Sequence, residues 1–233
     1  MNKALTIEVI VEGKTENNFV NEVLAPYWSS REIYVYAPVI RTGEDKKAGV
    51  IYTGGDIRFE RIKKRVGEFL QQRPDILVAT FVDFYGIKTW PGLELVQKND
   101  TPEQIASRLN SAAYEIMAGE FAEWHSSRRY VPFIAVHEFE ALLFSDASIL
   151  AEKLAIPLAI IEDTLAKSGS PEAIDNSPQT APSKRLEKWT NGMYGKTSDS
   201  LIIAKAIGID KMRRACPNFD AWLTSIESIQ TEE

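Results

Sequence analysis

The strongest constraint on the fold is an apolar run, residues 5–11, that ends in Glu12 and Gly13 and turns at once into a helical pattern. A strand that ends this way leaves Glu12 at the carboxyl edge of a sheet, where ligands bind in open α/β folds. Thr15 is a good helix cap, and Glu16 falls one turn into the helix, so both carboxylates can face one crevice. Two such acids repel each other unless a cation lies between them. Taken alone, the segment equally fits a solvated turn with two surface acids.

The same pattern recurs at two later strand ends. Residues 76–82 form a near-continuous apolar run, typical of a strand buried on both faces, and Asp83 follows with Gly86 close behind. A third strand-like segment, residues 130–136, leads into an acidic block that contains Glu138 and Glu140. Acids at three separate strand ends predict a divalent-metal site assembled at the edge of the sheet.

Strands and helices alternate along the first part of the chain, which favours a mostly parallel sheet flanked by helices. We expect a second strand from Ile33 to Ile40, a polar loop over 41–56 and a basic amphipathic helix from Ile57 to Leu70. A long helix should begin at Thr101-Pro102 and run toward Trp124. From Leu150 onward the pattern predicts short helices, with a surface loop over 167–183. The fold expected is an α/β domain over residues 1–150, with a helical C-terminal extension over 151–233 packed on it.

Composition indicates a soluble, cytoplasmic chain. With 233 residues and 44% hydrophobic residues the chain can bury a full core. No apolar run approaches the roughly 20 residues that span a bilayer, so no membrane partner is expected. Cys216 is the only cysteine, which fits a reducing compartment. The net charge of −6 counts against broad duplex binding, although acids that bind metal contribute to that charge.

The acidic segments resemble the signature blocks of a bacterial Toprim-like family that is catalogued as domain of unknown function 4276. The matching segments are Val11-Glu12-Gly13-Lys14-Thr15-Glu16, Val82-Asp83-Phe84-Tyr85-Gly86, His137 to Asp146, Ala181 to Leu186 and Cys216 to Leu223. The resemblance implies a Toprim-like sheet and a relation to the OLD-type nucleases. Its implied chemistry is magnesium-dependent breaking or joining of phosphodiesters.

The resemblance also implies roles for individual acids. Glu12 and Glu16 match the first pair of ligands for Mg²⁺ or Mn²⁺, and Asp83 matches the first acid of an Asp-x-Asp element. Glu140, with Glu138 nearby, matches the downstream acidic block. Glu12 and Asp83 are therefore the main candidates for catalysis as well as for metal binding.

Tyr85 departs from the family pattern because it stands where the second acid of Asp-x-Asp is expected. This puts a second metal position in doubt, although Glu138 or Glu140 could supply the missing oxygen. The Tyr85 hydroxyl could instead orient a phosphate or a water, which makes Tyr85 a candidate for substrate binding.

Three basic residues are further candidates. The OLD-type nucleases use a lysine beyond the acidic blocks, and we favour Lys184 for this role because Ser183 resembles a helix N-cap. Lys196, in a second polar loop, is a candidate for substrate binding. Arg58 follows the Gly54-Gly55 pair and begins a basic helix face that could hold a nucleic-acid backbone, although a turn and a solvated helix surface are the simpler interpretations.

These observations lead to a metal-dependent phosphodiester hydrolase that acts on DNA or RNA. A rival hypothesis from another class is a non-catalytic subunit that works beside an ATPase, and Tyr85 favours it. A third is a small-molecule phosphohydrolase with the same metal site. The partners expected are a nucleic acid, an ATPase under the second hypothesis, and a second copy of the chain.

Overall fold

The computed structural model describes residues 4–38, 41–45, 50–53, 57–174, 177 and 180–232. For residues 41–45, 50–53 and 230–232 the description covers the backbone alone.

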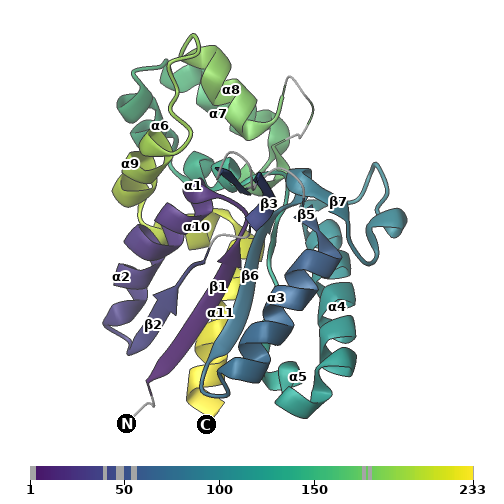
Figure 1. The fold of residues 1–233 in the computed structure, drawn as a ribbon. Coiled ribbons are helices and arrows are strands. Elements are labelled where there is room, and N and C mark those ends of the chain that lie inside the picture. Colours follow the sequence, from purple (N-terminus) through teal and green to yellow (C-terminus); the bar gives the residue numbers. More distant parts are fainter. Residues whose placement is uncertain are drawn as a thin grey trace.

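The centre of the fold is a parallel sheet whose strands follow the order β2-β1-β6-β8, with β9 also paired to β6 (Figure 1). Its strands are β1 (Leu5–Val11), β2 (Ile33–Tyr36), β6 (Leu77–Asp83), β8 (Tyr130–Val131) and β9 (Ile134–Ala135). Val11 pairs with Phe81, and Asp83 pairs with Ala135. The carboxyl ends of β1, β6 and β9 therefore meet at one edge, and the predicted α/β architecture with a mostly parallel sheet is confirmed.

Helices cover both faces of the sheet and form two hydrophobic clusters. On one face lie α3 (Phe59–Gln72) and α4 (Pro102–Glu120), and the short α5 (Ser126–Arg129) packs against α4. The predicted inner face of α3 is buried there through Ile62, Val66 and Leu70. On the other face lie α1 (Lys14–Phe19), a π-helical segment (Val20–Leu24) and α2 (Ala25–Ser29). The predicted start of α4 is confirmed, because Thr101 Oγ1 accepts the backbone N–H of Gln104.

The C-terminal part is helical, as predicted, and shares the second cluster with the sheet. The ring of Trp222 stacks on Phe133 at 4.9 Å between centroids and contacts Phe81 at 5.6 Å. The division of the chain at residue 150 stays a prediction. The helices are α6 (Ala147–Leu154), α7 (Leu158–Ser168), α8 (Pro182–Trp189), α9 (Ser198–Ile207), α10 (Ile209–Ala215) and α11 (Pro217–Glu232).

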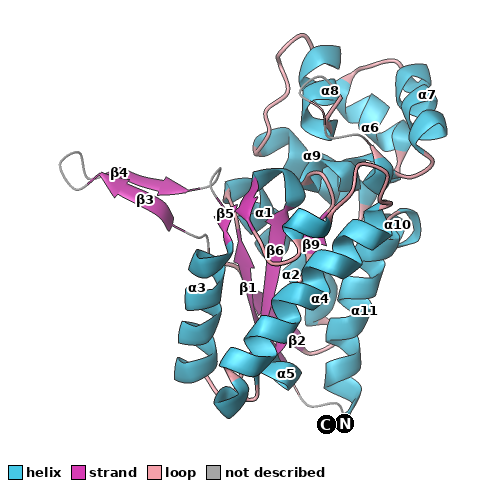
Figure 2. Cartoon of the chain, turned by 90° about the vertical axis from the view of Figure 1, so that its right-hand side faces the viewer, coloured by secondary structure: helices cyan, strands magenta, loops and turns pink. Residues whose placement is uncertain are grey.

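Several expectations about local structure were wrong. The segment 130–136 is not one strand, because Pro132 lacks the N–H that a continuous ladder needs and separates β8 from β9. The expected loop 41–56 contains an antiparallel hairpin of β3 (Arg41–Asp45) and β4 (Val50–Thr53), which projects from the body of the protein (Figure 2). The loop over 167–183 is shorter than expected, because α7 extends to Ser168 and α8 begins at Pro182.

Two further segments connect the sheet to the site. The two-residue strand β5 (Ile57–Arg58) pairs with β7 (Ile87–Thr89), which follows a 3-10 turn, Phe84–Gly86. A longer 3-10 helix, Phe139–Ser145, carries the third acidic block. The second strand was expected to reach Ile40, but β2 ends at Tyr36, and Ala37 and Pro38 are not in a strand. The basic helix begins at Phe59 rather than at Ile57, which lies in β5. Ile40 itself and the Gly54-Gly55 pair lie outside the described residues.

Candidate functional site

The first two acids flank the start of α1. This helix begins at Lys14 with Gly13 as its N-cap, so the expectation that Thr15 caps it was wrong. Glu16 is buried, and its Oε2 accepts the backbone N–H of Gly13 at 2.9 Å. An acid at the third helical position commonly reaches back in this way, because it satisfies an N–H that the helix leaves unpaired. Glu16 therefore fixes the turn that presents Glu12.

Glu12 lies directly after β1, and its carboxylate packs against the backbone of Gly86. A Cβ added at Gly86 would lie 2.5 Å from Glu12 Oε2 and 2.8 Å from Oε1. Only glycine leaves room for the carboxylate in this position. The glycine after the second strand thus shapes the space around the acid at the end of the first.

Asp83 links the second acidic segment to the third. It is the last residue of β6, and its Oδ1 accepts the backbone N–H of Phe139 at 2.9 Å. The backbone N–H of Tyr85 donates to the carbonyl oxygen of His137 at 3.1 Å, which adds a second tie between the segments. Tyr85 is 50% exposed and therefore lies at the surface rather than inside the acidic cluster.

Glu140 is completely buried and pairs with a lysine from the C-terminal helices. Lys196 Nζ lies 3.1 Å from Glu140 Oε1, and the lysine side chain is about half exposed, at 47%. Within the part of the chain that the structure describes, Glu140 Oε2 has no hydrogen-bond partner. A buried carboxylate oxygen without a donor is costly and suits a ligand position.

The loop that carries Lys196 is held in place by its neighbours. Asp199 Oδ2 accepts the backbone N–H of Gly195 at 2.8 Å, and the Tyr194 hydroxyl bonds Ser200 Oγ at 2.5 Å. A Cβ at Gly195 would lie 2.5 Å from Ser198 Oγ. These contacts with the start of α9 hold the loop in a position from which Lys196 reaches Glu140.

Glu138 and Lys184 have partners that point away from a shared metal position. Both oxygens of Glu138 are bound by Ser183, whose N–H lies 2.9 Å away and whose hydroxyl lies 3.0 Å away. Because α8 begins at Pro182, Ser183 lies inside its first turn, and the expectation that Ser183 is its N-cap was wrong. Lys184 Nζ bonds Glu187 on the surface of the same helix at 2.8 Å. Glu138 therefore anchors α8, and Lys196 is the lysine in contact with the acids.

The pKa values show that these groups act on one another. Burial raises the pKa of the Asp83 carboxyl well above its usual value, and the charges of Glu16, Glu12 and Glu140 add to this effect against that of Lys196. Burial raises the pKa of Glu140 to about 7, although Lys196 opposes the shift. Burial lowers the pKa of Lys196, but the surrounding acids outweigh it and leave that pKa above its ordinary value. The acids and Lys196 therefore lie close enough together for each charge to shift the pKa of the others.

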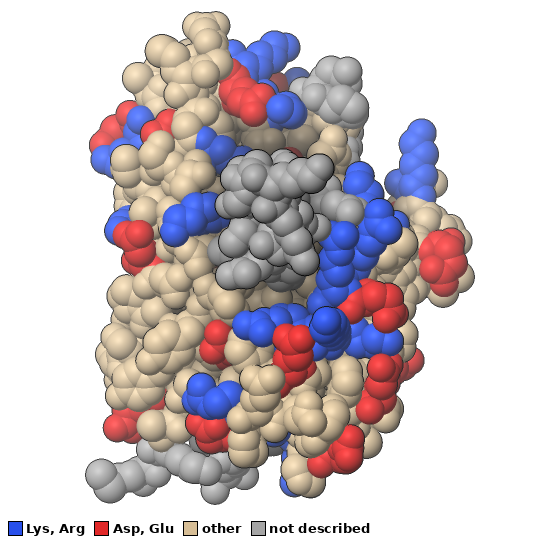
Figure 3. Space-filling model, in the orientation of Figure 1, with Lys and Arg blue, Asp and Glu red and all other residues tan. Residues whose placement is uncertain are grey.

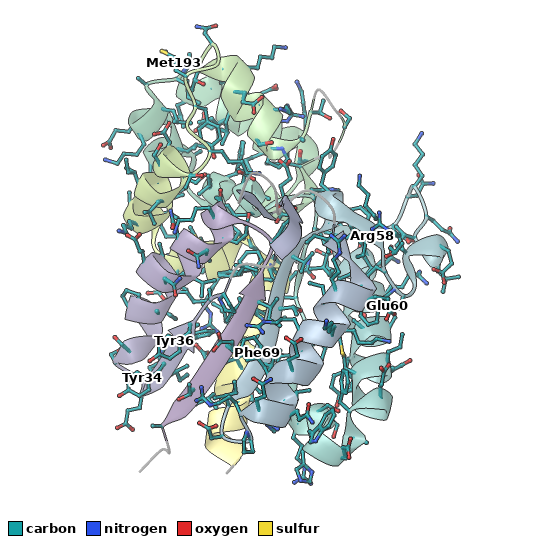
Figure 4. All side chains as sticks on the ribbon, in the orientation of Figure 1. Tyr34, Tyr36, Arg58, Glu60, Phe69 and Met193 are labelled. Carbon is teal, nitrogen blue, oxygen red and sulfur yellow. The ribbon has the colours of Figure 1, made fainter. Side chains whose placement is uncertain are left out.

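Arg58 lies beside this edge on the outer side. It is exposed, it is the N-cap of α3, and its strand β5 pairs with β7 directly after Gly86 (Figure 4). The sequence-predicted residues thus divide into two groups. Glu12, Glu16, Asp83, Glu140 and Lys196 come together, whereas Tyr85, Arg58 and Lys184 lie around them at the surface.

The donor chemistry of the site fits a small hard cation. Its available groups are carboxylate oxygens, which Mg²⁺ and Mn²⁺ prefer, and Glu140 Oε2 is buried without a donor. Among the described residues no three His, Cys, Asp or Glu side chains stand close enough together to hold an ion by themselves. A site with one or two carboxylates and several waters matches both observations, because Mg²⁺ usually keeps part of its hydration shell.

Sequence reasoning missed the roles of Gly86, Ser183 and Phe139. Each of these residues contacts an acid more than 40 positions away: Gly86 contacts Glu12, Ser183 contacts Glu138 and Phe139 contacts Asp83. Such contacts leave no periodic pattern in the local sequence. A cavity of about 1090 Å³ lies between α4 and α11. It is separate from this site, because none of the candidate metal ligands lines it.

The fold and the site define an α/β protein with an acidic, lysine-paired cluster at the carboxyl edge of a parallel sheet. The chain belongs to the family described as Domain of unknown function (DUF4276), whose model matches residues 11–227. Comparisons with curated proteins and with solved structures give no significant match. In the described ranges, none of the helices combines the length and the apolar character that a membrane crossing needs.

Proposed function

We propose that this protein is a metal-dependent phosphodiester hydrolase of the Toprim type that acts on DNA or RNA. The observation that carries the proposal is the cluster of Glu12, Asp83 and Glu140 at one sheet edge, with Lys196 against Glu140. Structural acids are ordinarily satisfied by local donors. Here an acid with a raised pKa and a buried oxygen lacking a donor lie together, as is typical of functional sites.

Glu12, Asp83 and Glu140 would hold Mg²⁺ or Mn²⁺, one or two of them directly and the rest through waters that stay bound to the ion. Bound there, the ion would supply Lewis acidity, which lowers the pKa of water and offsets the charge of a phosphate. Glu16 and Glu138 take part indirectly, because they hold the start of α1 and the start of α8 in place.

The protein's own residues supply proton transfer and charge. With a pKa of about 7, Glu140 can accept or release a proton near neutral pH. Lys196 lies against Glu140, so its ammonium group can offset charge that develops on a phosphate oxygen. This contact favours Lys196 over Lys184 for the lysine role that the family resemblance implies. Arg58, at the rim, can contact a neighbouring phosphate.

A partner-dependent subunit is the second candidate function. The observation that favours it is that no three potential ligands in the described residues are preassembled, while Tyr85 replaces an acid and its side chain is exposed. A partner such as an ATPase could then complete the site or use the protein without cleavage.

A cleavage assay separates these functions. We expect single-stranded DNA, duplex DNA or RNA to be cleaved with Mg²⁺ or Mn²⁺ and not with EDTA. Glu12→Gln and Asp83→Asn should lower the rate at least 100-fold, because each removes a negative ligand. Glu162→Gln on the exposed surface of α7 is the matched control and should cleave at the wild-type rate.

The substrate that is cleaved distinguishes the three candidate functions. Metal-dependent cleavage of p-nitrophenyl phosphate without any cleavage of nucleic acid would favour a small-molecule phosphohydrolase. No cleavage of any substrate with either metal would support the partner-dependent subunit and contradict the proposed hydrolase.

A further inference from the structure

One half of a sheet face is left without a helix. On the α3 side of the sheet, α3 lies in front of β6, and no helix among the described residues covers β1 and β2 on that side (Figure 1). Ile33 and Val35 of β2 point to the opposite, buried face, so Tyr34 and Tyr36 point to the uncovered one. Their exposed fractions are 47% and 58%. Two large aromatic side chains are therefore presented to solvent from one strand.

The register places these tyrosines beside α3. Tyr34 pairs with Thr6 and Tyr36 pairs with Glu8, two positions that share the face of Ile10. Ile10 packs in the cluster formed with α3, so both tyrosines belong to that side of the sheet. Figure 4 shows Tyr34 and Tyr36 on β2 and Phe69 on α3, on the two sides of β1. We call Tyr34, Tyr36 and Phe69 the aromatic face.

A line of arginines on α3 borders the aromatic face. Within α3, positions 61, 65 and 69 follow the four-residue spacing that places side chains on one side of a helix, and positions 58 and 73 are the N-cap and C-cap of that helix. They are Arg58, Arg61, Arg65, Phe69 and Arg73, and we call the four arginines the arginine stripe. Arg65 lies over the Phe69 ring at 4.1 Å. Burial raises the pKa of the Glu8 carboxyl on β1, and the charges of Arg65 and Arg73 oppose this rise. Both arginines therefore lie close to the sheet beside α3.

The opposite side of α3 has a different role. Lys63 Nζ lies 3.0 Å from Glu60 and 3.0 Å from Glu120 of α4, so this lysine joins two helices. In Figure 3 Lys and Arg side chains gather over the upper part of α3, and the surface beside it over β1 and β2 is largely uncharged. Cations thus border the aromatic face on one side.

The arginine stripe leads to the acidic site. The 14 residues of α3 span about 21 Å. Arg73 follows its last residue at the lower end of the sheet, and Arg58 precedes its first residue at the edge that carries Glu12. Arg65 and Arg73 pair with Glu68 and Asp75 at 2.9 Å. Such ion pairs at the surface contribute little to the stability of the fold. A phosphate can therefore replace the carboxylate as the bidentate partner of an arginine.

We propose that the aromatic face and the arginine stripe bind a single-stranded nucleic acid and lead it to the acidic edge; this inference rests on the proposed hydrolase. Tyr34 and Tyr36 are about 6.6 Å apart along one strand face and would each stack an unpaired base. Aromatic side chains on an open sheet hold bases in this way, while arginines hold the backbone. A duplex keeps its bases stacked inside, so the substrate class inferred is a single strand.

The test measures binding of fluorescein-labelled oligo(dT) in EDTA, where cleavage cannot interfere. Wild type should bind this strand at least tenfold more tightly than a duplex or an abasic strand of equal length. Tyr34→Leu/Tyr36→Leu keeps apolar area but removes the rings, and should weaken binding at least tenfold. Arg65→Ala should reduce the slope of log K against log salt by about 0.7.

Control variants remove similar groups elsewhere. Met193, 79% exposed, lies at the far end of the protein from the aromatic face (Figure 4). Lys153 belongs to α6, which lies at that same end (Figure 1). Met193→Ala and Lys153→Ala should bind oligo(dT) as wild type does. Circular dichroism on every variant verifies folding, and Tyr34→Phe/Tyr36→Phe, which keeps both rings, should retain binding.

The results distinguish this inference from the proposed function. Binding that depends on both tyrosines without any cleavage supports the inference and contradicts the hydrolase. Cleavage whose KM is unchanged in Tyr34→Leu/Tyr36→Leu overturns the inference and leaves the hydrolase intact. If wild type binds the abasic strand as tightly as oligo(dT), the inference is wrong. It is also wrong if wild type is a dimer, Tyr34→Leu/Tyr36→Leu is a monomer, and both bind oligo(dT) with the same affinity.

Discussion

Lys196 Nζ lies 3.1 Å from Oε1 of the fully buried Glu140, although 56 residues separate the two in sequence. The lysine comes from the loop before α9, and the acid from the 3-10 helix that follows β9. This pair joins the C-terminal helices to the sheet edge. It also supplies the cation that faces the acidic cluster.

Removing this lysine should destabilise the protein in a pH-dependent way. In EDTA, Lys196→Ala should lower the free energy of unfolding by about 1–2 kcal/mol at pH 8, a value reduced from that of a buried pair because Lys196 is half exposed. At pH 6 Glu140, with a pKa of about 7, is largely protonated, so the loss should be smaller. Urea unfolding at both pH values measures the difference.

The matched control for Lys196→Ala is Lys184→Ala, which removes a surface pair with Glu187 and should cost less than about 0.5 kcal/mol. Equal losses for Lys196→Ala at pH 6 and pH 8 would contradict the assigned role of Glu140.

Gly86→Ala should disturb the site without unfolding the protein. Its added Cβ would lie 2.5 Å from Glu12 Oε2, so the end of a flexible side chain must move. The φ angle of Gly86 is not positive, so alanine suits the backbone. We expect a melting temperature near that of wild type, but loss of Mn²⁺ binding in calorimetry to the extent seen for Glu12→Gln.

Gly119→Ala provides the comparison for the same chemical change. Gly119 lies in α4 with open space around its Cα, and alanine there should raise stability by up to about 1 kcal/mol with Mn²⁺ binding unchanged. Normal Mn²⁺ binding by Gly86→Ala would show that Glu12 is not a ligand in its present position.

Deprotonation of Glu172 should lower the free energy of unfolding as pH rises. Its oxygens accept the backbone N–H groups of Asn218 and Phe219 at 3.0 Å each, which caps α11. Burial outweighs these bonds and raises its pKa from 4.5 to about 7. The proton is therefore held more tightly in the folded state, and this stabilisation is full below pH 4.5 and is lost as pH rises through about 7.

Glu172→Gln removes this titration and keeps one acceptor for α11. Relative to the variant, wild type should lose up to about 3 kcal/mol between pH 4.5 and pH 8, as measured by urea unfolding in EDTA. A constant difference between the two proteins over this range would show that Glu172 has the same pKa folded and unfolded.

Tyr85 tests how the missing acid affects the site. Its backbone bond to His137 does not depend on the side chain, so substitutions should fold normally. A new carboxylate two residues after Asp83 would add negative charge at the rim of the acidic cluster and should tighten metal binding, so Tyr85→Asp should raise cleavage most at low Mg²⁺. Tyr85→Phe should leave the rate unchanged unless the hydroxyl contacts the phosphate. Lower rates for both variants would instead assign Tyr85 to substrate positioning.

The sheet and the meeting of the acids could be predicted because strand ends leave a local signal. An apolar run that stops at an acid and a glycine fixes both the strand and the edge that carries the acid, as for Glu12 and Asp83. The alternation of strands with helices then implies parallel strands, which brings these edges together.

Contacts between distant segments could not be predicted. Nothing near Lys196 in sequence distinguishes it from Lys184, and its contact with Glu140 depends on how α9 packs. Ser183 resembled a helix cap, but its partner is Glu138, 45 residues away. The β3–β4 hairpin was missed because Gly43 and Gly49 favoured a loop, and the break at Pro132 divided a strand that periodicity alone makes continuous.

The central claim is that the acids at the sheet edge form one cation site, and Mn²⁺ calorimetry at pH 8 tests it most directly. Wild type should bind Mn²⁺ with sub-millimolar to millimolar affinity, as water-rich sites do. Glu12→Gln, Asp83→Asn and Glu140→Gln should each weaken binding at least tenfold, while Glu162→Gln should bind as wild type. Absence of Mn²⁺ binding to wild type, or unchanged binding in all three variants, would contradict the account.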